Sequence, residues 1–189
     1  MRTVYRLVSR EHRFDRRGRA FRRRRREPAV ITVAELAPFA PLSVLDEAHL
    51  ARLAEVGSEA AYTDGQRLLV EGGRAERCLL IAQGQVVIDA RVPGRGEVVV
   101  QTLGAGDLLG WSWLAPPYRW HFGARAVGPV RAIEFDAATL TRFAETDPEF
   151  GHALTRMMLT AVLDRLQATR ARLLDLYADP VEPHVRAGR

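Results

Sequence analysis

Apolar and polar residues follow three successive patterns along the chain, and the first pattern is helical. In residues 41–56, PLSVLDEAHLARLAEV, apolar side chains recur at helical spacing behind Ser43, which is placed to cap the first turn. These apolar positions are Leu45, Leu50, Leu53 and Val56. The pattern predicts a short amphipathic helix.

The second pattern is a series of short β-type segments separated by glycine-containing breaks. The segments are QRLLV, RCLLIA, QVVIDA, EVVVQTL, HFGARAV and PVRAIEF. The breaks contain Gly72-Gly73, Gly84, PGRG and GAG, which are turn signals. Several short strands joined by glycine turns are typical of a β-barrel or jelly roll.

The third pattern is helical again. Asp136 is placed to cap a helix that runs to about Glu145, and Asp147-Pro148-Glu149 has the features of a second helix start. In this second helix one stripe repeats at alternating steps of four and three residues, as in a heptad seam. The stripe consists of Leu159, Leu163, Leu166, Arg170, Leu173 and Tyr177.

This seam has two interpretations. A helix of about 30 residues spans about 45 Å, which is longer than the cover that a small barrel requires. The seam either packs on the barrel or pairs with a second copy of the chain. Arg170 within the stripe suits a partly hydrated interface better than a core, so we favour a homodimer.

Charge divides the chain into an arm, a body and a tail. Residues 1–29 contain 12 Arg and three acidic residues, a net charge of +9, whereas the whole chain carries +5, which leaves −4 for residues 30–189. We predict a disordered arm over 1–29, one domain over 30–178 and a tail over 179–189. Within the domain, the barrel is expected at about 58–135 and the C-terminal helices at about 136–177.

The arginine run at residues 22–26 is the strongest charge feature of the arm. Such a run can bind nucleic acid or an anionic membrane surface through counterion release. The alternatives are a solvated tail, or a start codon set upstream of a true initiator at Val30. Nucleic acid is therefore a predicted partner only if the arm is translated and functional.

The sequence does not contain the residues that several catalytic and metal-binding mechanisms require. The chain contains no Lys, which excludes a Walker loop, a Schiff base and a lysine general base. The five His residues lack metal-ligand spacing with Cys78, and Ser112 has no G-x-S-x-G elbow. His121 is interpreted as a solvent-facing strand residue. We predict no catalytic residue, no metal site and no enzyme activity.

The cellular location is predicted from the lack of a membrane span, the lack of a signal peptide and the cysteine content. No apolar stretch approaches the roughly 20 residues of a membrane span. The first 30 residues lack the apolar region of a signal peptide, and a single Cys cannot form an internal disulfide. We therefore expect a cytoplasmic protein without a membrane span.

The order of these elements over about residues 38–177 resembles the cyclic-nucleotide-binding domain, the sensor half of the catabolite-activator and fumarate-nitrate-regulator superfamily. Four motifs carry the resemblance: DGQRLLVEGGRAERCLLIAQGQVVI with Gly65, Gly72 and Gly84, then LGAGDLLG, DPEF and RLQATR. The resemblance implies a mainly β fold with flanking helices. It would be a double-stranded β-helix (jelly-roll) barrel followed by a long C-terminal dimerisation helix.

The resemblance also places residues 106–126, GDLLGWSWLAPPYRWHFGARA, at the family's phosphate-binding cassette. In that family a Gly precedes a Glu that binds the ribose hydroxyl, and an Arg followed by Ser or Thr closes over the cyclic phosphate. Here Trp111 follows Gly110, and Arg119-Trp120 stands near the expected Arg-Ser pair. Indole only donates hydrogen bonds, so Trp111 cannot replace the Glu. The candidate ligand-binding residues are Gly110, Trp111, Ser112, Trp113, Arg119, Trp120, Thr169 and Arg170.

Three states of this pocket remain open. In the first, which we favour, the indoles plug the pocket and the domain is a ligand-free dimer module. In the second, Trp111 or Trp113 stacks against a different ligand, Arg119 binds its anionic group and Thr169 reaches it from the long helix. In the third, the pocket binds an ordinary cyclic nucleotide. We expect no cofactor, with a cyclic nucleotide as the alternative.

The output of the domain is predicted from the short segment after the long helix. In the family a winged helix-turn-helix occupies this place and reads DNA, but only twelve residues come after Tyr177 here. We predict a regulatory or protein-interaction module with a degenerate or repurposed pocket, acting as a homodimer on another protein. Its interface would include Leu159, Leu163, Leu166, Leu173 and Tyr177. The alternative is a ligand-sensing transcriptional regulator of the same superfamily that lacks its DNA-binding half.

Overall fold

The computed structural model describes residues 31–177, so the arm predicted over 1–29 and the tail predicted over 179–189 lie outside the described residues. The helices are α1 (Val33–Leu36), the 3-10 helix η1 (Ala40–Leu42), α2 (Glu47–Val56), α3 (Ala137–Thr146) and α4 (Pro148–Tyr177). The strands are β1 (Gly57–Tyr62), β2 (Arg67–Leu69), β3 (Arg77–Val92), β4 (Gly96–Leu103), β5 (Leu108–Leu109) and β6 (Gly123–Asp136).

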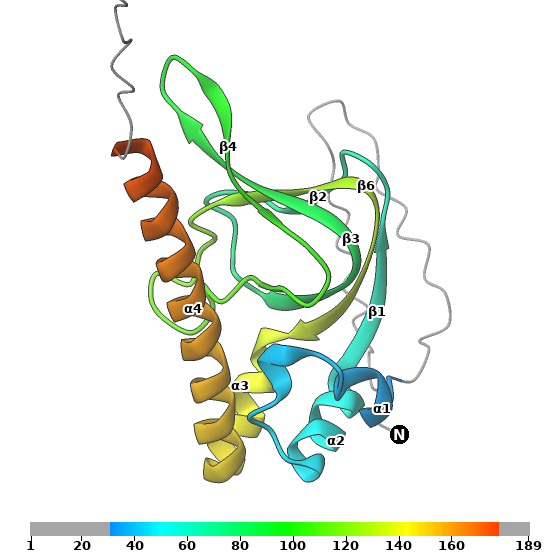
Figure 1. Ribbon diagram of the computed structural model, residues 1–189. Helices are drawn as coiled ribbons and strands as arrows, with labels where there is room; N and C mark the ends of the chain where they lie inside the picture. Colours follow the sequence, from blue (N-terminus) through cyan, green and yellow to red (C-terminus); the bar gives the residue numbers. More distant parts are fainter. Residues whose placement is uncertain (1–30, 178–189) are drawn as a thin grey trace, which may run out of the picture.

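The strands form one antiparallel sheet that curls on itself (Figure 1). Its main path is β1-β6-β3-β4, with β2 paired to β6 and β5 paired to β3. The helices α1, α2 and α3 gather at one end of the sheet, and α4 runs along its side (Figure 1). The mainly β jelly-roll fold with flanking helices and a long C-terminal helix is therefore confirmed.

Two long strands replace four of the predicted segments. β3 pairs with β6 from Arg77 opposite Asp136 to Asp89 opposite Gly123, through register shifts on both sides of Gln83. Gly84 lies inside β3 at a positive φ of +92°, and a Cβ there would approach the Pro129 carbonyl oxygen to 2.4 Å. The glycine therefore bends a continuous strand and does not end it.

Two strands were not predicted, and both lack a strong apolar pattern. β1 has the sequence GSEAAY and contains one fully buried side chain, that of Tyr62. It is held by pairing with β6 from Gly57 opposite Phe135 to Tyr62 opposite Val130. β5 is only two residues long and pairs with β3. Only their partner strands identify these segments as strands.

The predicted first helix begins later than expected. Ser43 ends η1, and α2 is capped by Asp46, whose carboxylate accepts a hydrogen bond from the His49 N–H at 2.8 Å. The prediction of Ser43 as the N-cap is therefore wrong. Leu50 and Leu53 face the core, as the helical pattern predicted.

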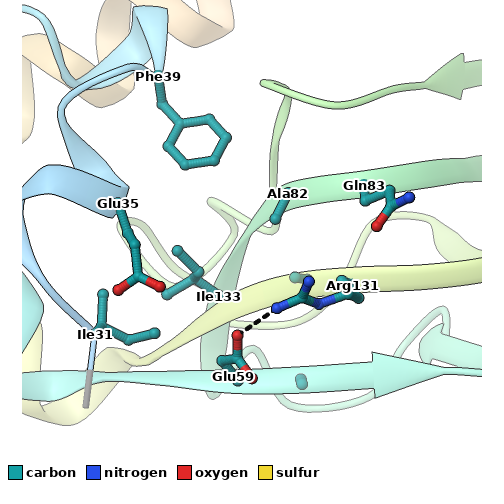
Figure 2. Close-up of a pocket in the computed structure, with 10 residues that line it drawn as sticks. Ile31, Glu35, Phe39, Glu59, Ala82, Gln83, Arg131 and Ile133 are labelled. Atoms are coloured by element: carbon teal, nitrogen blue, oxygen red, sulfur yellow. Dashed lines mark hydrogen bonds and ion pairs between the residues drawn. The ribbon is translucent and has the colours of Figure 1, made fainter. Parts of the chain in front are cut away.

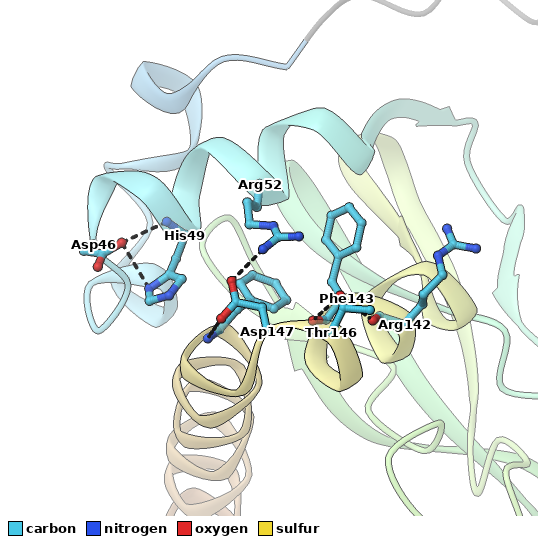
Figure 3. A network of polar contacts seen from close by, with 8 residues as sticks. Asp46, His49, Arg52, Arg142, Phe143, Thr146 and Asp147 are labelled. Carbon is cyan, nitrogen blue, oxygen red and sulfur yellow. Dashed lines mark hydrogen bonds and ion pairs between the residues drawn. The ribbon is translucent and has the colours of Figure 1, made fainter.

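The predicted starts of the last two helices are confirmed. Asp136 caps α3 by accepting from the Thr139 N–H, and the Asp147 carboxylate accepts from the Phe150 N–H at 3.1 Å. Arg52 of α2 donates to Asp147 at 2.5 Å and lies 4.7 Å from the centroid of the Phe143 ring (Figure 3). These contacts join α2, α3 and α4 at one end of the domain.

The two halves of α4 have different surroundings. In its first half Phe150, Leu154, Met157 and Met158 are buried in the core. From Leu159 onwards the side chains of the seam are exposed, at 55% for Leu159, 43% for Leu166 and 52% for Leu173. The seam therefore does not pack into the barrel core, and the side chain of Tyr177 lies outside the described residues. Within residues 31–177, no helix has the length and apolar character needed to cross a membrane.

Candidate ligand-binding site

A cavity of about 340 Å³ lies between the sheet, the segment 110–123 and α4. We call this the elbow cavity. Its apolar walls include Leu69 and Ile88 from the sheet and Val162 from α4. Its polar lining residues are Gln101, Ser112, His121, Arg165 and Thr169. Pockets that bind small molecules have volumes from about 300 Å³ upward and are mostly apolar with a few polar groups. The elbow cavity has both properties.

The elbow segment is attached to the loop between β2 and β3. The Trp120 N–H donates to the Gly73 carbonyl at 2.9 Å, and the Gly72 N–H donates to the Trp120 carbonyl at 2.8 Å. Gly110, at a φ of +88°, allows the Trp120 ring to approach, because a Cβ there would lie 3.1 Å from that ring. The backbone of the segment thus holds Trp120 in place.

The three indoles have different surroundings. Trp120 and Trp113 are core residues with 6% and 8% of their surface exposed, and Trp120 also forms part of the cavity wall. Trp111 is only partly buried and lines the cavity. Of the two indoles predicted to stack against a ligand, Trp111 faces the cavity, whereas Trp113 does not line it.

Arg165 of α4 provides the permanent charge of the cavity. Its guanidinium carbon lies 4.3 Å from the centroid of the Trp111 ring, and its Nη2 donates to the Leu108 carbonyl at 2.8 Å. Burial lowers the pKa of Arg165 to about 10, and the Asp107 carboxylate opposes this shift to a smaller extent. Arg165 therefore remains protonated at neutral pH.

The guanidinium of Arg165 forms no ion pair with a carboxylate of the described residues. Arg52, Arg67 and Arg131 each contact a carboxylate at 2.6 Å or less. The Asp107 carboxylate instead accepts a hydrogen bond from the Gly104 N–H at 2.7 Å. Arg165 is thus a partly buried cation that hydrogen-bonds a carbonyl and lies over an aromatic ring.

Ser112 and His121 lie together on the elbow side of the cavity. Ser112 Oγ and His121 Nδ1 are 3.2 Å apart, within hydrogen-bond distance. His121 is exposed, as predicted, but it precedes β6 and is not a strand residue, and it also lines the cavity. Across the cavity, the hydroxyl of Thr169 donates to the Arg165 carbonyl of its own helix at 2.9 Å.

The structure brings together only some of the predicted ligand-binding residues. Those that line the cavity are Gly110, Trp111, Ser112, Trp120 and Thr169. Arg119 is exposed, and its Nη1 donates to the Gly72 carbonyl at 2.8 Å, so it does not face the cavity. Arg170 is exposed on α4 and does not line the cavity. The expectation that Arg119 would face a ligand's anionic group is therefore corrected.

Arg165 is the main cavity residue that the sequence did not reveal. It is the first residue of the RLQATR motif in the long helix, which pointed only to the family resemblance. Its place in the cavity depends on α4 lying against the elbow. In the described part of the chain, no group of three or more His, Cys, Asp or Glu residues is arranged to hold a metal ion.

A second cavity of about 250 Å³ lies where α1 meets the sheet, and we call it the N-terminal cavity. It is lined by Ile31 and Phe39 and by three charged residues, Glu35, Glu59 and Arg131 (Figure 2). Arg131 Nη2 donates to Glu59 Oε1 at 2.6 Å. Glu35 accepts from the backbone N–H and hydroxyl of Thr32 in a capping box. Each charged group of this cavity has a partner within the chain.

Residues 59–147 match the family model described as the cyclic nucleotide-binding domain. Over these residues the chain is similar to the cyclic nucleotide-binding domain. The match extends from β1 through the elbow to the joint between α3 and α4, and it includes both the sheet and the elbow wall of the cavity. The fold is accordingly that of a cyclic nucleotide-binding regulatory domain.

Solved structures support this assignment. A protein of Geobacter metallireducens assigned to the cyclic nucleotide-binding proteins is 26% identical, with a TM-score of 0.66 over 72% of this chain and 98% of its own. The N-terminal domain of a transcriptional regulator from Streptomyces coelicolor is 25% identical, with a TM-score of 0.56 over 73% and 94%.

A more distant structure shares the fold. The regulatory domain of protein kinase A from Toxoplasma gondii, determined with cAMP, is 17% identical, with a TM-score of 0.57 over 68% of this chain and 48% of its own. No curated protein matches the chain.

Proposed function

We propose that this protein is a regulatory module that binds a small molecule in the elbow cavity and acts as a homodimer on another protein. The observation that carries this proposal is that α4 forms one wall of the cavity and also carries the exposed seam. Leu166 belongs to both, because it lines the cavity and is 43% exposed. A ligand in the cavity would therefore contact the helix through which a partner copy would be bound.

The open volume favours a repurposed pocket over a plugged one. Trp120 is packed into the core and Trp111 lies against Arg165, yet about 340 Å³ stays open between them, the sheet and α4. Indoles that replaced a ligand completely would leave no such volume. The cavity thus supports the sensing alternative, with a ligand that fits the residues now present.

A cyclic nucleotide is a poor candidate for this ligand. Trp111 stands where the family's ribose-binding Glu is expected, and Arg119 is turned away towards Gly72. The loss of one charged hydrogen-bond partner costs about 1.5–3 kcal/mol, which is roughly a tenfold to hundredfold loss of affinity. Calorimetry with cyclic AMP should detect no tight binding. Tight binding would restore the ordinary cyclic-nucleotide function.

The homodimer is tested by placing charge on the seam. Leu163→Glu combined with Leu173→Glu would put four carboxylates into a parallel interface, so we expect monomers in sedimentation velocity. Neither residue lines the cavity. The matched control is Thr160→Glu with Gln167→Glu, two exposed α4 positions outside the seam. A dimer that survives the seam variant, or is lost equally in the control, would place the interface elsewhere.

Ligand binding is tested by tryptophan fluorescence in a Trp113→Phe background. This substitution removes the one indole that does not line the cavity, so Trp111 and Trp120 remain as reporters. We expect a saturable change with at least one compound in a panel of cyclic mono- and dinucleotides and small apolar acids and amides. If no compound in the panel changes the signal, the sensing function is rejected.

A further inference from the structure

The elbow cavity presents one permanent positive charge within an apolar wall. The apolar wall includes Leu69, Ile88, Val100, Leu109 and Phe122, and the only Arg, Lys, Asp or Glu among the lining residues is Arg165. A buried guanidinium without a carboxylate is unfavourable unless another group compensates its charge. Burial lowers the pKa of Arg165, which is the expected consequence of this arrangement.

We propose that the ligand of the elbow cavity is a small apolar monocarboxylic acid whose carboxylate binds Arg165. This inference rests on the proposed function, in which the cavity binds a small molecule. The acid's apolar body would lie between the sheet residues and Val162 of α4, and its carboxylate would point to the guanidinium.

The guanidinium has donors available for this contact. It carries five N–H donors in a planar fork that matches the two oxygens of a carboxylate. The hydrogen bond to the Leu108 carbonyl occupies Nη2, and the Trp111 ring covers one face of the plane. An anion in the plane can thus be bound without breaking either contact, and the Trp111 ring would support it from one side.

The single positive charge of the cavity favours a ligand with a single negative charge. One guanidinium balances one negative charge, so a second charge on the ligand would be desolvated without compensation. The other polar lining side chains provide an amide, two hydroxyls and an imidazole, from Gln101, Ser112, Thr169 and His121. These few groups, against a wall that is mostly apolar, leave most of a sugar or nucleobase without hydrogen-bond partners. A monoanion with a hydrocarbon body is the chemistry that this lining satisfies.

The site couples the ligand to the helix that carries the seam. Arg165 and Leu166 are consecutive residues of α4, and Arg165 contacts β5 through the Leu108 carbonyl and the elbow through Trp111. A carboxylate at the guanidinium would join ligand, elbow and α4 in one set of contacts. Binding should therefore protect the backbone amides of α4 near Arg165 from hydrogen exchange.

The test compares acids with their neutral amides on the full chain. The probes are 3-phenylpropanoate and octanoate, with 3-phenylpropanamide and octanamide as uncharged counterparts, measured by calorimetry and tryptophan fluorescence. We expect each acid to bind at least about tenfold more tightly than its amide, as for a charge-assisted contact. Phenyl phosphate, a dianion near neutral pH, should bind more weakly than 3-phenylpropanoate.

Two variants identify the cation. Arg165→Gln should abolish the preference for acid over amide. Trp111→Glu should also abolish it, because the new carboxylate would pair with Arg165 within the protein, while Trp120 remains as a reporter. Arg119→Gln is the matched control, since Arg119 bonds Gly72 outside the cavity, and it should leave the preference unchanged. Circular dichroism of each variant establishes that the fold is retained.

The outcomes separate this inference from the proposed function. Equal binding of acid and amide, or an acid preference that survives Arg165→Gln, overturns the carboxylate inference and leaves ligand sensing intact. Tighter binding of phenyl phosphate than of 3-phenylpropanoate also overturns it. If neither acid binds, the inference is wrong. If the amides and cyclic nucleotides also fail to bind, the proposed sensing function falls with it.

Discussion

The two cavities of this domain each contain an arginine, and the two arginines differ in what neutralises them. In the N-terminal cavity Arg131 pairs with Glu59 at 2.6 Å, and the other acidic residue, Glu35, is used in the capping box of α1 (Figure 2). In the elbow cavity Arg165 hydrogen-bonds a carbonyl and lies over an indole ring, and it forms no ion pair with a carboxylate of residues 31–177. A cation that is paired within the chain is explained by the fold, whereas one that is not remains available to a ligand.

The same contrast holds for the joint between the helices. There Arg52 pairs with Asp147 at 2.5 Å and lies over Phe143, so the cation has both a carboxylate and an aromatic partner (Figure 3). Arg165 has the aromatic partner without the carboxylate. Trp111→Glu would convert the elbow site into an internally paired site, and it is the most direct way to remove the difference.

The largest expected effect on the free energy of unfolding comes from truncating an aromatic residue in the wall of each cavity. Trp120→Ala removes a buried core indole and should lower the free energy of unfolding by about 3–5 kcal/mol. Phe39→Ala in the N-terminal cavity should cost less, because Phe39 is only partly buried. Denaturant unfolding of both variants measures the difference. Equal losses would mean that the elbow wall is no better packed than the N-terminal one.

Neutralising the two arginines should change stability in opposite directions. Arg165→Met removes a cation that burial disfavours, and should raise the free energy of unfolding by about 1 kcal/mol. Arg131→Met breaks an ion pair whose arginine is 62% exposed, and should lower it by about 1 kcal/mol or less. The two variants are compared by denaturant unfolding at neutral pH. A loss of stability in Arg165→Met would show that the protein itself compensates this charge.

Alkaline pH should reduce the stability that Arg165→Met gains over the wild type. Burial lowers the folded-state pKa of Arg165 to about 10, below its pKa in the unfolded chain, so above pH 10 the unfolded chain binds more protons at this site. The wild type should therefore gain about 1 kcal/mol relative to Arg165→Met between about pH 9 and pH 11. Thermal unfolding of both proteins across this range tests the sign, and a constant difference would contradict it.

The smallest effect is expected at the helix joint under acid conditions. The Phe150 N–H and the Arg52 guanidinium lower the pKa of Asp147 below its usual 3.8. This carboxylate therefore contributes stability above the unfolded pKa, and the contribution is lost as the pH falls through the folded pKa. Asp147→Asn should be less stable than the wild type near neutral pH, and their melting temperatures should converge at low pH. Convergence already at neutral pH would mean that the Asp147 contacts add no stability.

Local features of the fold were predictable because they depend on residues close in sequence. Asp136 and the Asp147-Pro148 pair mark helix starts through contacts within three residues. β1 was missed for the opposite reason: GSEAAY has little apolar pattern, and its strand conformation comes from pairing with β6. The break expected at Gly84 became a bend inside β3, since the close approach that requires Gly84 occurs only in the folded sheet.

Some features of the candidate site could likewise be predicted from the sequence, and others are defined only by the folded structure. The sequence by itself determined the elbow, the Trp at the family's Glu position and the heptad periodicity of α4, because each is a matter of residue type and spacing. Only the tertiary structure decided that Arg119 turns to Gly72 and that Arg165 lies over Trp111. The physical reason is that the cavity is bounded by the sheet, the elbow and α4, which are distant in sequence. The charge left unpaired among them is defined only after the chain has folded.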